Sequence, residues 1–135
     1  MAGYSPTPLV KKLGIKEGFI IKLINEPSYY LNLFADFPAS ISYSENENKH
    51  TIDFIHLFCT TFKELENNAP ILKSQLKKDG LLWISWPKGN SGIITDLKRD
   101  LIREYVLDLG LVDVKVCAVD EKWSGLKFVY RLKDR

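Results

Sequence analysis

Side chains that could bind or transform a ligand follow four apolar runs of this sequence. They carry carboxylate, hydroxyl, ammonium or indole groups, which suit hydrogen bonding, anion binding and stacking on a planar ligand. The candidate ligand-binding residues are Glu26, Thr60, Trp86, Lys88, Ser91, Thr95, Asp120, Trp123 and Ser124. They form one site only if the fold brings all four stretches to the same edge.

The stretch WPKGNSGIITDL, residues 86–97, offers the most specific of these chemistries. Lys88 and two glycines precede a helix that we expect to begin at Thr95, and the free N–H groups of a helix start can bind an anion. The stretch lacks the spacing and the closing Gly-Lys-Ser/Thr of a phosphate-binding loop. Asp96 at the helix start would also repel an anion. A loop that only turns the chain is therefore favoured, and an anion contact is the alternative that stays open.

The histidines and cysteines give no sign of a catalytic pair or a metal site. His56 lies inside an apolar run, which predicts a buried, hydrogen-bonded side chain. Cys59 is three residues further on, so the two side chains would point to opposite faces of a strand. The two histidines and two cysteines of the chain are not spaced as metal ligands are. We expect reduced cysteines, with a disulfide as the alternative, and neither a metal nor a cofactor.

The three tryptophans differ in their expected roles. Trp83 and Trp86 are three positions apart in one apolar run, so they should face opposite sides of a strand. Trp83 is expected in the core. Trp86, at the exit of the run, either lines a pocket or covers the sheet edge. Trp123 lies in a turn, where we expect it to fold back over the core rather than to offer a stacking surface.

Composition limits what the chain can bind. Its 135 residues are 45% hydrophobic and 27% charged, which fits one ordinary globular domain over residues 1–135. The formal net charge of +2 argues against nucleic acid or anionic lipid as a partner. The longest apolar runs fall well short of a membrane-spanning helix, and no secretory signal is visible. We therefore expect a cytoplasmic protein without membrane contact.

The apolar pattern predicts strands that alternate with helices. Helices are expected at 8–13, 28–37, 62–80 and 95–109, and strands at 19–24, 39–44, 51–60, 81–86, 112–120 and 126–134. This order predicts a mostly parallel, Rossmann-like sheet covered on both faces, in one three-layer α/β domain that ends in an antiparallel hairpin. Ligands of such sheets bind beyond the carboxyl ends of the strands, where the four polar stretches would meet.

From LKKDGLLWISW, residues 76–86, to its end, the chain is similar in layout to the second half of class I methyltransferases. The resemblance implies a methyltransferase-like but truncated fold. It also implies a glycine-rich turn after the first strand, whereas residues 25–30 read NEPSYY and contain no glycine. Glu45 could stand for the acidic residue that holds the ribose of the cofactor in such proteins.

Three stretches also resemble a family of small uncharacterised bacterial proteins, a domain of unknown function. They are GYSPTPLVKKLGIKEG at 3–18, LLWISWPK at 81–88 and GLVDVKVCAVDEKWSGLKFVYRLKDR at 110–135. This resemblance spans nearly the whole chain. It implies a bacterial cytoplasmic protein and assigns no catalytic residue.

These observations favour a non-catalytic binding or interaction module on a degenerate methyltransferase-like fold. Its partner is unknown at this point, with a protein and a small anionic ligand as the two alternatives. The alternative is a binder of a small, nucleotide-like anion, or an enzyme, that uses the carboxyl-end edge of the sheet. Whether the protein is an enzyme stays open at this point. Nucleic-acid binding is a third hypothesis, and the near-neutral charge argues against it.

Overall fold

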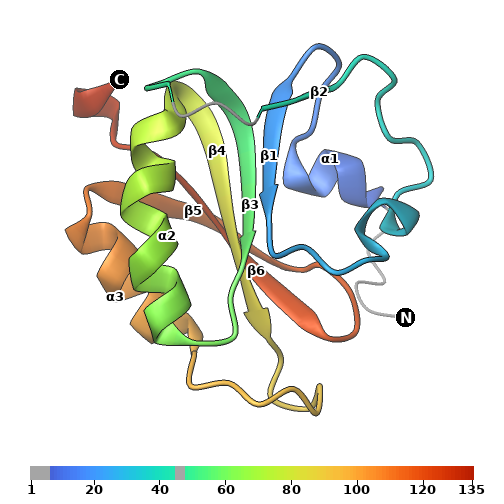
Figure 1. The fold of residues 1–135 in the computed structure, drawn as a ribbon, viewed down its shortest axis with the longest axis vertical. Coiled ribbons are helices and arrows are strands. Elements are labelled where there is room, and N and C mark those ends of the chain that lie inside the picture. The colour runs from blue at the N-terminus through green and yellow to red at the C-terminus, as the bar shows by residue number, and fades with distance from the viewer. Residues whose placement is uncertain (1–6, 45–47) are drawn as a thin grey trace.

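The computed structural model describes residues 7–44 and 48–135, which form a single α/β domain around one mixed sheet (Figure 1). In chain order the elements are α1 (Leu9–Leu13), β1 (Ile20–Ile24), the 3-10 helix η1 (Tyr30–Leu33), β2 (Ser42–Tyr43), β3 (Ile52–Phe58), α2 (Phe62–Gln75), β4 (Leu76–Pro87), α3 (Arg99–Asp108), β5 (Leu111–Ala118), β6 (Trp123–Tyr130) and the 3-10 helix η2 (Leu132–Asp134). This arrangement confirms the predicted fold class.

The sheet has the strand order β2-β1-β3-β4-β6-β5. Strands β1, β2, β3 and β4 pair in parallel, whereas β6 is antiparallel to both of its neighbours, β4 and β5. Strand β5 therefore runs in the same direction as β4. As a result β1, β3, β4 and β5 all end at one edge of the sheet, which we call the carboxyl edge.

Side chains of β3 alternate between the two faces of the sheet, and both faces are covered. Ile55 and Leu57 are fully buried in the main core, beneath α2 and α3. Phe54 and Phe58 are buried on the opposite face, where α1 and η1 lie (Figure 1). Burial on both faces explains why this strand is an almost unbroken apolar run.

The end of α2 differs from the expectation. The helix ends at Gln75 and the chain enters β4 at Leu76, so the predicted helix over 62–80 is wrong in its last turn. Leu76 is fully buried and pairs with Ile52 of β3. Lys77, expected near the helix end, instead makes an ion pair with Asp53 at 2.9 Å. Pairing with a neighbouring strand outweighs the helical propensity of the lysines.

The start of α3 is also later than predicted, because the helix begins at Arg99 rather than at Thr95. The Thr95 hydroxyl donates to the Thr60 carbonyl at 2.6 Å, and the Asp96 carboxylate accepts from the Phe62 N–H at 2.8 Å. These side chains therefore hold the segment before α3 against the start of α2. The prediction that Thr95 begins a helix is wrong.

Two shorter elements depart from their predicted lengths. The helix expected over residues 28–37 is a single 3-10 turn, η1. The outer strand expected over residues 39–44 is reduced to the two residues of β2, which does lie at the edge of the sheet. Glu45, considered above as a ribose-binding residue, lies outside the described residues.

Helix α2 begins with a capping box, and this supports a first prediction. The Thr61 hydroxyl accepts from the Glu64 N–H at 3.2 Å, while the Glu64 carboxylate accepts from the Thr61 N–H at 3.1 Å. Thr61→Ala should lower the free energy of unfolding by about 1 kcal/mol in urea denaturation. Thr61→Ser keeps the hydroxyl and should stay near the parent. Equal stability of both variants would contradict this role of the box.

Candidate functional site

The strand order locates the place where a sheet of this kind binds its ligand. From β1, the chain crosses to β2 on one side and later returns to β3 on the other side. Such a reversal leaves a crevice outside the carboxyl ends of the two diverging strands. In this protein the crevice lies above the ends of β1 and β3, near Ile24 and Phe58.

Aromatic side chains of the protein itself fill this crevice. Tyr30 of η1 is 1% exposed, and its ring meets that of Phe58 edge-on, with 5.7 Å between centroids. Trp123 packs edge-on against the other side of Phe58 at 5.1 Å. Val119 completes this buried group. We call these four residues the aromatic plug. Trp123 thus folds back over the core, as predicted.

A buried hydrogen-bond chain lies directly beneath the aromatic plug. The Tyr30 hydroxyl is 2.9 Å from Nδ1 of His56, and Nε2 of His56 is 2.7 Å from the Ser85 hydroxyl. His56 and Ser85 are both fully buried. Burial lowers the pKa of His56 to about 3, which keeps the imidazole neutral. Because no substrate can reach a fully buried hydroxyl, this chain is structural, and the prediction of a buried His56 is confirmed.

The loops after β1 and β5 are joined across the carboxyl edge. The Tyr29 hydroxyl donates to Oδ2 of Asp120 at 2.7 Å, and Oδ1 of Asp120 accepts from the backbone N–H groups of Lys122 and Trp123. We call the first of these contacts the Tyr29–Asp120 clasp. Burial raises the pKa of Tyr29 to about 12, with a further contribution from Asp120. The predicted site residue Asp120 therefore shapes the β5–β6 turn and closes the crevice.

The hydroxyl groups predicted for the site have partners within the fold. The Thr60 hydroxyl donates to Glu64 at 2.8 Å, and the Ser91 hydroxyl accepts from the Ile93 N–H at 3.1 Å. Thr95 bonds Thr60, as described above. The free N–H groups required by an anion site at Thr95 are absent there, because the helix starts four residues later.

The other predicted residues are divided between the core and the strand ends. Trp86 is 8% exposed and belongs to the main core, on the face opposite Trp83, so the predicted opposition of the two tryptophans is confirmed. Ser124 lies in β6 and pairs with Trp86 and Ala118. Lys88 is half-buried, and its N–H donates to the Lys122 carbonyl at 2.8 Å. None of these three extends the crevice.

Open space lies beside the end of β1, where the predicted residue Glu26 sits. Two cavities of about 490 and about 270 Å³ are both lined by Leu23, Glu26 and Tyr43, so they adjoin. Ser44 lines the larger one, and its buried hydroxyl has no hydrogen-bond partner among the described residues. Tyr43 ends the two-residue strand β2 and Ser44 follows it, and neither is among the predicted site residues.

The Cys59 thiol does not form a reactive centre. Cys59 is 1% exposed, and burial raises the pKa of its thiol to about 12. Both cysteines are free. Over residues 7–44 and 48–135, no group of three or more His, Cys, Asp or Glu side chains could hold a metal ion. In the same part of the chain, every helix is too short or too polar to cross a membrane.

No protein-family model and no curated protein matches this chain. Among solved structures it is similar to a SAM-dependent methyltransferase from Aquifex aeolicus, with 17% identity, a TM-score of 0.62, and coverage of 89% of this chain and 86% of that one. A putative type 11 methyltransferase from Sulfolobus solfataricus has 15% identity and a TM-score of 0.64, with coverage of 91% of this chain and 89% of that one. Magnesium protoporphyrin IX methyltransferase from Synechocystis, solved with bound SAH, has 11% identity and a TM-score of 0.63, with coverage of 90% of this chain and 78% of that one. The chain therefore has the class I methyltransferase fold in a reduced form.

Proposed function

We propose that this protein is a non-catalytic binding module built on the methyltransferase fold. The observation that carries the proposal is the closure of the crevice between β1 and β3. The aromatic plug packs over the end of β3, and the Tyr29–Asp120 clasp ties the loops after β1 and β5 together. Such a fold keeps its sheet, but its ligand crevice is filled. Partners are then bound by the outer surface of the domain.

The turn after β1 argues further against S-adenosylmethionine in this crevice. Methyltransferases resembling this chain have a glycine-rich turn there, which lets the backbone approach the cofactor. Asn25 supplies the left-handed conformation of the turn, with φ 58°, but Pro27 and Tyr30 follow where glycines would be expected. The residues present do not fit the cofactor, and we derive no methyl-transfer step.

A second function, small-ligand binding, is favoured by the cavities at Glu26. The buried Ser44 hydroxyl has no hydrogen-bond partner among residues 7–44 and 48–135, which is costly unless a ligand binds it, and the Glu26 carboxylate lines the same space. These groups suit a ligand that offers hydroxyl or amine donors. Such a ligand would contact the turn after β1 and Tyr30, which line the smaller cavity.

Isothermal titration of the full chain with S-adenosylmethionine and S-adenosylhomocysteine tests the first proposal. We expect no saturable heat, because the plug occupies the space. A thermal-shift panel of nucleotides, phosphate esters and amines tests the second. A ligand at a hundred times its dissociation constant stabilises by about 2.7 kcal/mol, which raises the midpoint by several degrees.

Matched variants show where on the protein a ligand that shifts the melting temperature binds. Glu26→Gln should abolish a shift caused by a ligand at the cavities, while Glu66→Gln, an exposed carboxylate on α2, should leave it unchanged. Saturable binding of S-adenosylmethionine that survives Glu26→Gln would contradict the closed crevice and restore methyl transfer as the function.

A further inference from the structure

Strand β5 forms one edge of the sheet, and its outer side is uncovered. Within the described residues the only strand that pairs with it is β6. Val114, Lys115 and Val116 are consecutive and all exposed, with both valines 52% exposed. The register of β5 against β6 shifts between Asp113 and Lys115, and from Lys115 to Ala118 the edge regularly presents backbone N–H and C=O groups that can pair with another strand. Two exposed valines add apolar surface to that edge.

On the face that carries α3, a groove runs between this helix and β5. It has a volume of about 480 Å³ and an apolar floor made by Val114, Val116 and Leu126. Arg99, Arg103 and Lys115 also line it, together with the carboxylates of Asp100 and Asp113. The groove therefore has an apolar floor with a small excess of basic groups beside it.

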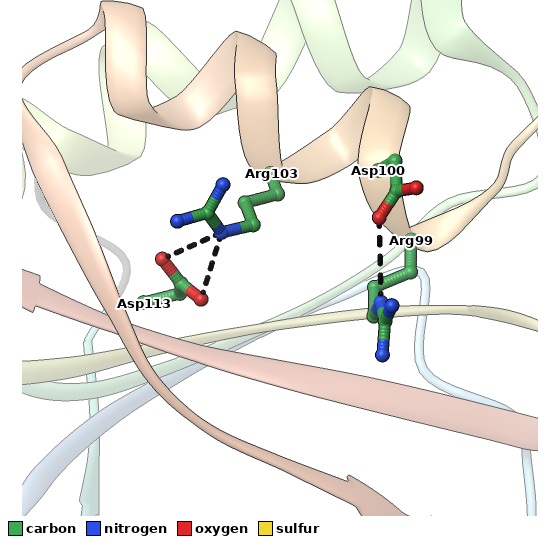
Figure 2. A network of polar contacts seen from close by, with 4 residues as sticks. All are labelled: Arg99, Asp100, Arg103 and Asp113. Carbon is green, nitrogen blue, oxygen red and sulfur yellow. Dashed lines mark hydrogen bonds and ion pairs between the residues drawn. The ribbon is translucent and has the colours of Figure 1, made fainter.

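The two arginines keep hydrogen-bonding capacity. Both oxygens of Asp113 accept from Nε of Arg103 at 3.1 Å, which fixes the guanidinium (Figure 2). Arg99 extends from α3 toward the strands, and its Nε is 3.5 Å from Asp100 (Figure 2). The arginine side chains are 60% and 48% exposed, for Arg99 and Arg103 respectively. Each can therefore donate hydrogen bonds to an incoming carboxylate.

The opposite face of β5 is also basic. The Lys115 ammonium donates to the Lys12 carbonyl at 3.2 Å, which places β5 beside α1. Burial and the nearby Lys115 both lower the pKa of Lys127. Burial raises the pKa of Cys117, whereas Lys12, Lys115 and Lys127 lower it, so three ammonium groups surround this thiol. Cations therefore flank the edge strand on both faces of the sheet.

We propose that an acidic, extended segment of a partner protein adds to β5 as a further strand. Successive side chains of a strand point to opposite faces, so carboxylates of the segment meet Arg99 and Arg103 on one face and Lys115 and Lys127 on the other. Its apolar side chains enter the groove over Val116. A second copy of this chain is a poor occupant, because two basic edges would repel each other. The inference rests on the proposed binding role and names the class of partner.

Selection from a phage-displayed library of random dodecapeptides on the immobilised full chain tests this proposal. We expect selected sequences in which aspartate or glutamate is mixed with valine, isoleucine or aromatic residues, and in which proline is rare. The affinity of the best synthetic peptide is then measured by fluorescence polarisation. Proline placed at its centre should weaken binding at least about tenfold, because backbone pairing is lost.

Charge reversals on the protein localise the binding. Lys115→Glu and Arg99→Glu change exposed residues on opposite faces of the edge. Each should lower the affinity for the peptide at least about tenfold. Lys63→Glu, an exposed lysine on α2, makes the same charge change elsewhere and should have little effect. Circular dichroism of each variant checks that the fold is kept.

Several outcomes would overturn the proposal. They are a failure to enrich acidic sequences, equal binding to Lys115→Glu and to the parent, or indifference to proline in the peptide. Stronger competition by an oligonucleotide than by the selected peptide would assign the basic edge to nucleic acid instead. The cofactor titration described above has a separate readout, so failure of the binding role and failure of this surface can be told apart.

Discussion

Tyr30→Ala is expected to lower the free energy of unfolding by about 3–5 kcal/mol, which is close to the cost of removing other large aromatic side chains from a core. The ring is 1% exposed and contacts the rings of Phe34, His56 and Phe58 edge-on. Its removal leaves a cavity in the aromatic plug and deprives His56 of a hydrogen-bond partner. Urea denaturation followed by tryptophan fluorescence measures the loss.

Tyr30→Phe separates packing from hydrogen bonding. The phenyl ring keeps the edge-on contacts, while one ring nitrogen of His56 loses its partner, so we expect a loss of about 1–3 kcal/mol. This variant should remain folded even if Tyr30→Ala does not. A Tyr30→Phe protein as unstable as the alanine variant, or a Tyr30→Ala protein as stable as the parent, would contradict the place given to Tyr30 in the plug.

Stability should fall as the pH drops below about 6.5, largely because of His56. Burial lowers the pKa of this imidazole to about 3 in the folded state, from an ordinary value of 6.5. Between these two values the unfolded chain binds a proton that the folded chain excludes. The contribution of His56 is therefore complete above pH 6.5, and it decreases by up to about 1.4 kcal/mol for each pH unit below it.

His56→Phe removes this group while keeping a ring of similar shape in the core. The slope of unfolding free energy against pH, measured by urea denaturation from neutral to mildly acidic pH, should become shallower in the variant. Some slope should remain, because hydrogen bonds from Thr60 and Thr61 lower the pKa of Glu64 and its contribution also decreases in acid. An NMR titration of the parent in which the His56 ring protonates near pH 6.5 would contradict the account.

The layers of the fold could be predicted because they depend on local apolar patterns. An unbroken apolar run such as β3 can be satisfied only between two layers, and this places His56 and Phe58 inside. The end of α2 could not be predicted in the same way. Lys77 and Lys78 continue a helical pattern, and only the pairing of Leu76 with Ile52 converts this segment into strand.

The candidate site was harder to predict, because its main contacts join distant residues. Glu26 was correctly placed at the end of a strand, but the bond between Tyr29 and Asp120 spans 91 positions and leaves no local pattern. Asp96 looks like the start of the next helix, yet its carboxylate bonds to the beginning of α2. The sequence does not show to which helix a polar side chain near a helix end donates or accepts its hydrogen bonds.

The most direct test of the closed crevice is a set of ¹H–¹⁵N correlation spectra of the labelled full chain, recorded with increasing S-adenosylmethionine. The account predicts no saturable shifts for the amides of residues 25–26, 28–30 and 59–61, because the plug and the clasp exclude the cofactor. Saturable shifts confined to these two loops would show that the crevice opens and accepts the cofactor, and the non-catalytic function would then be wrong.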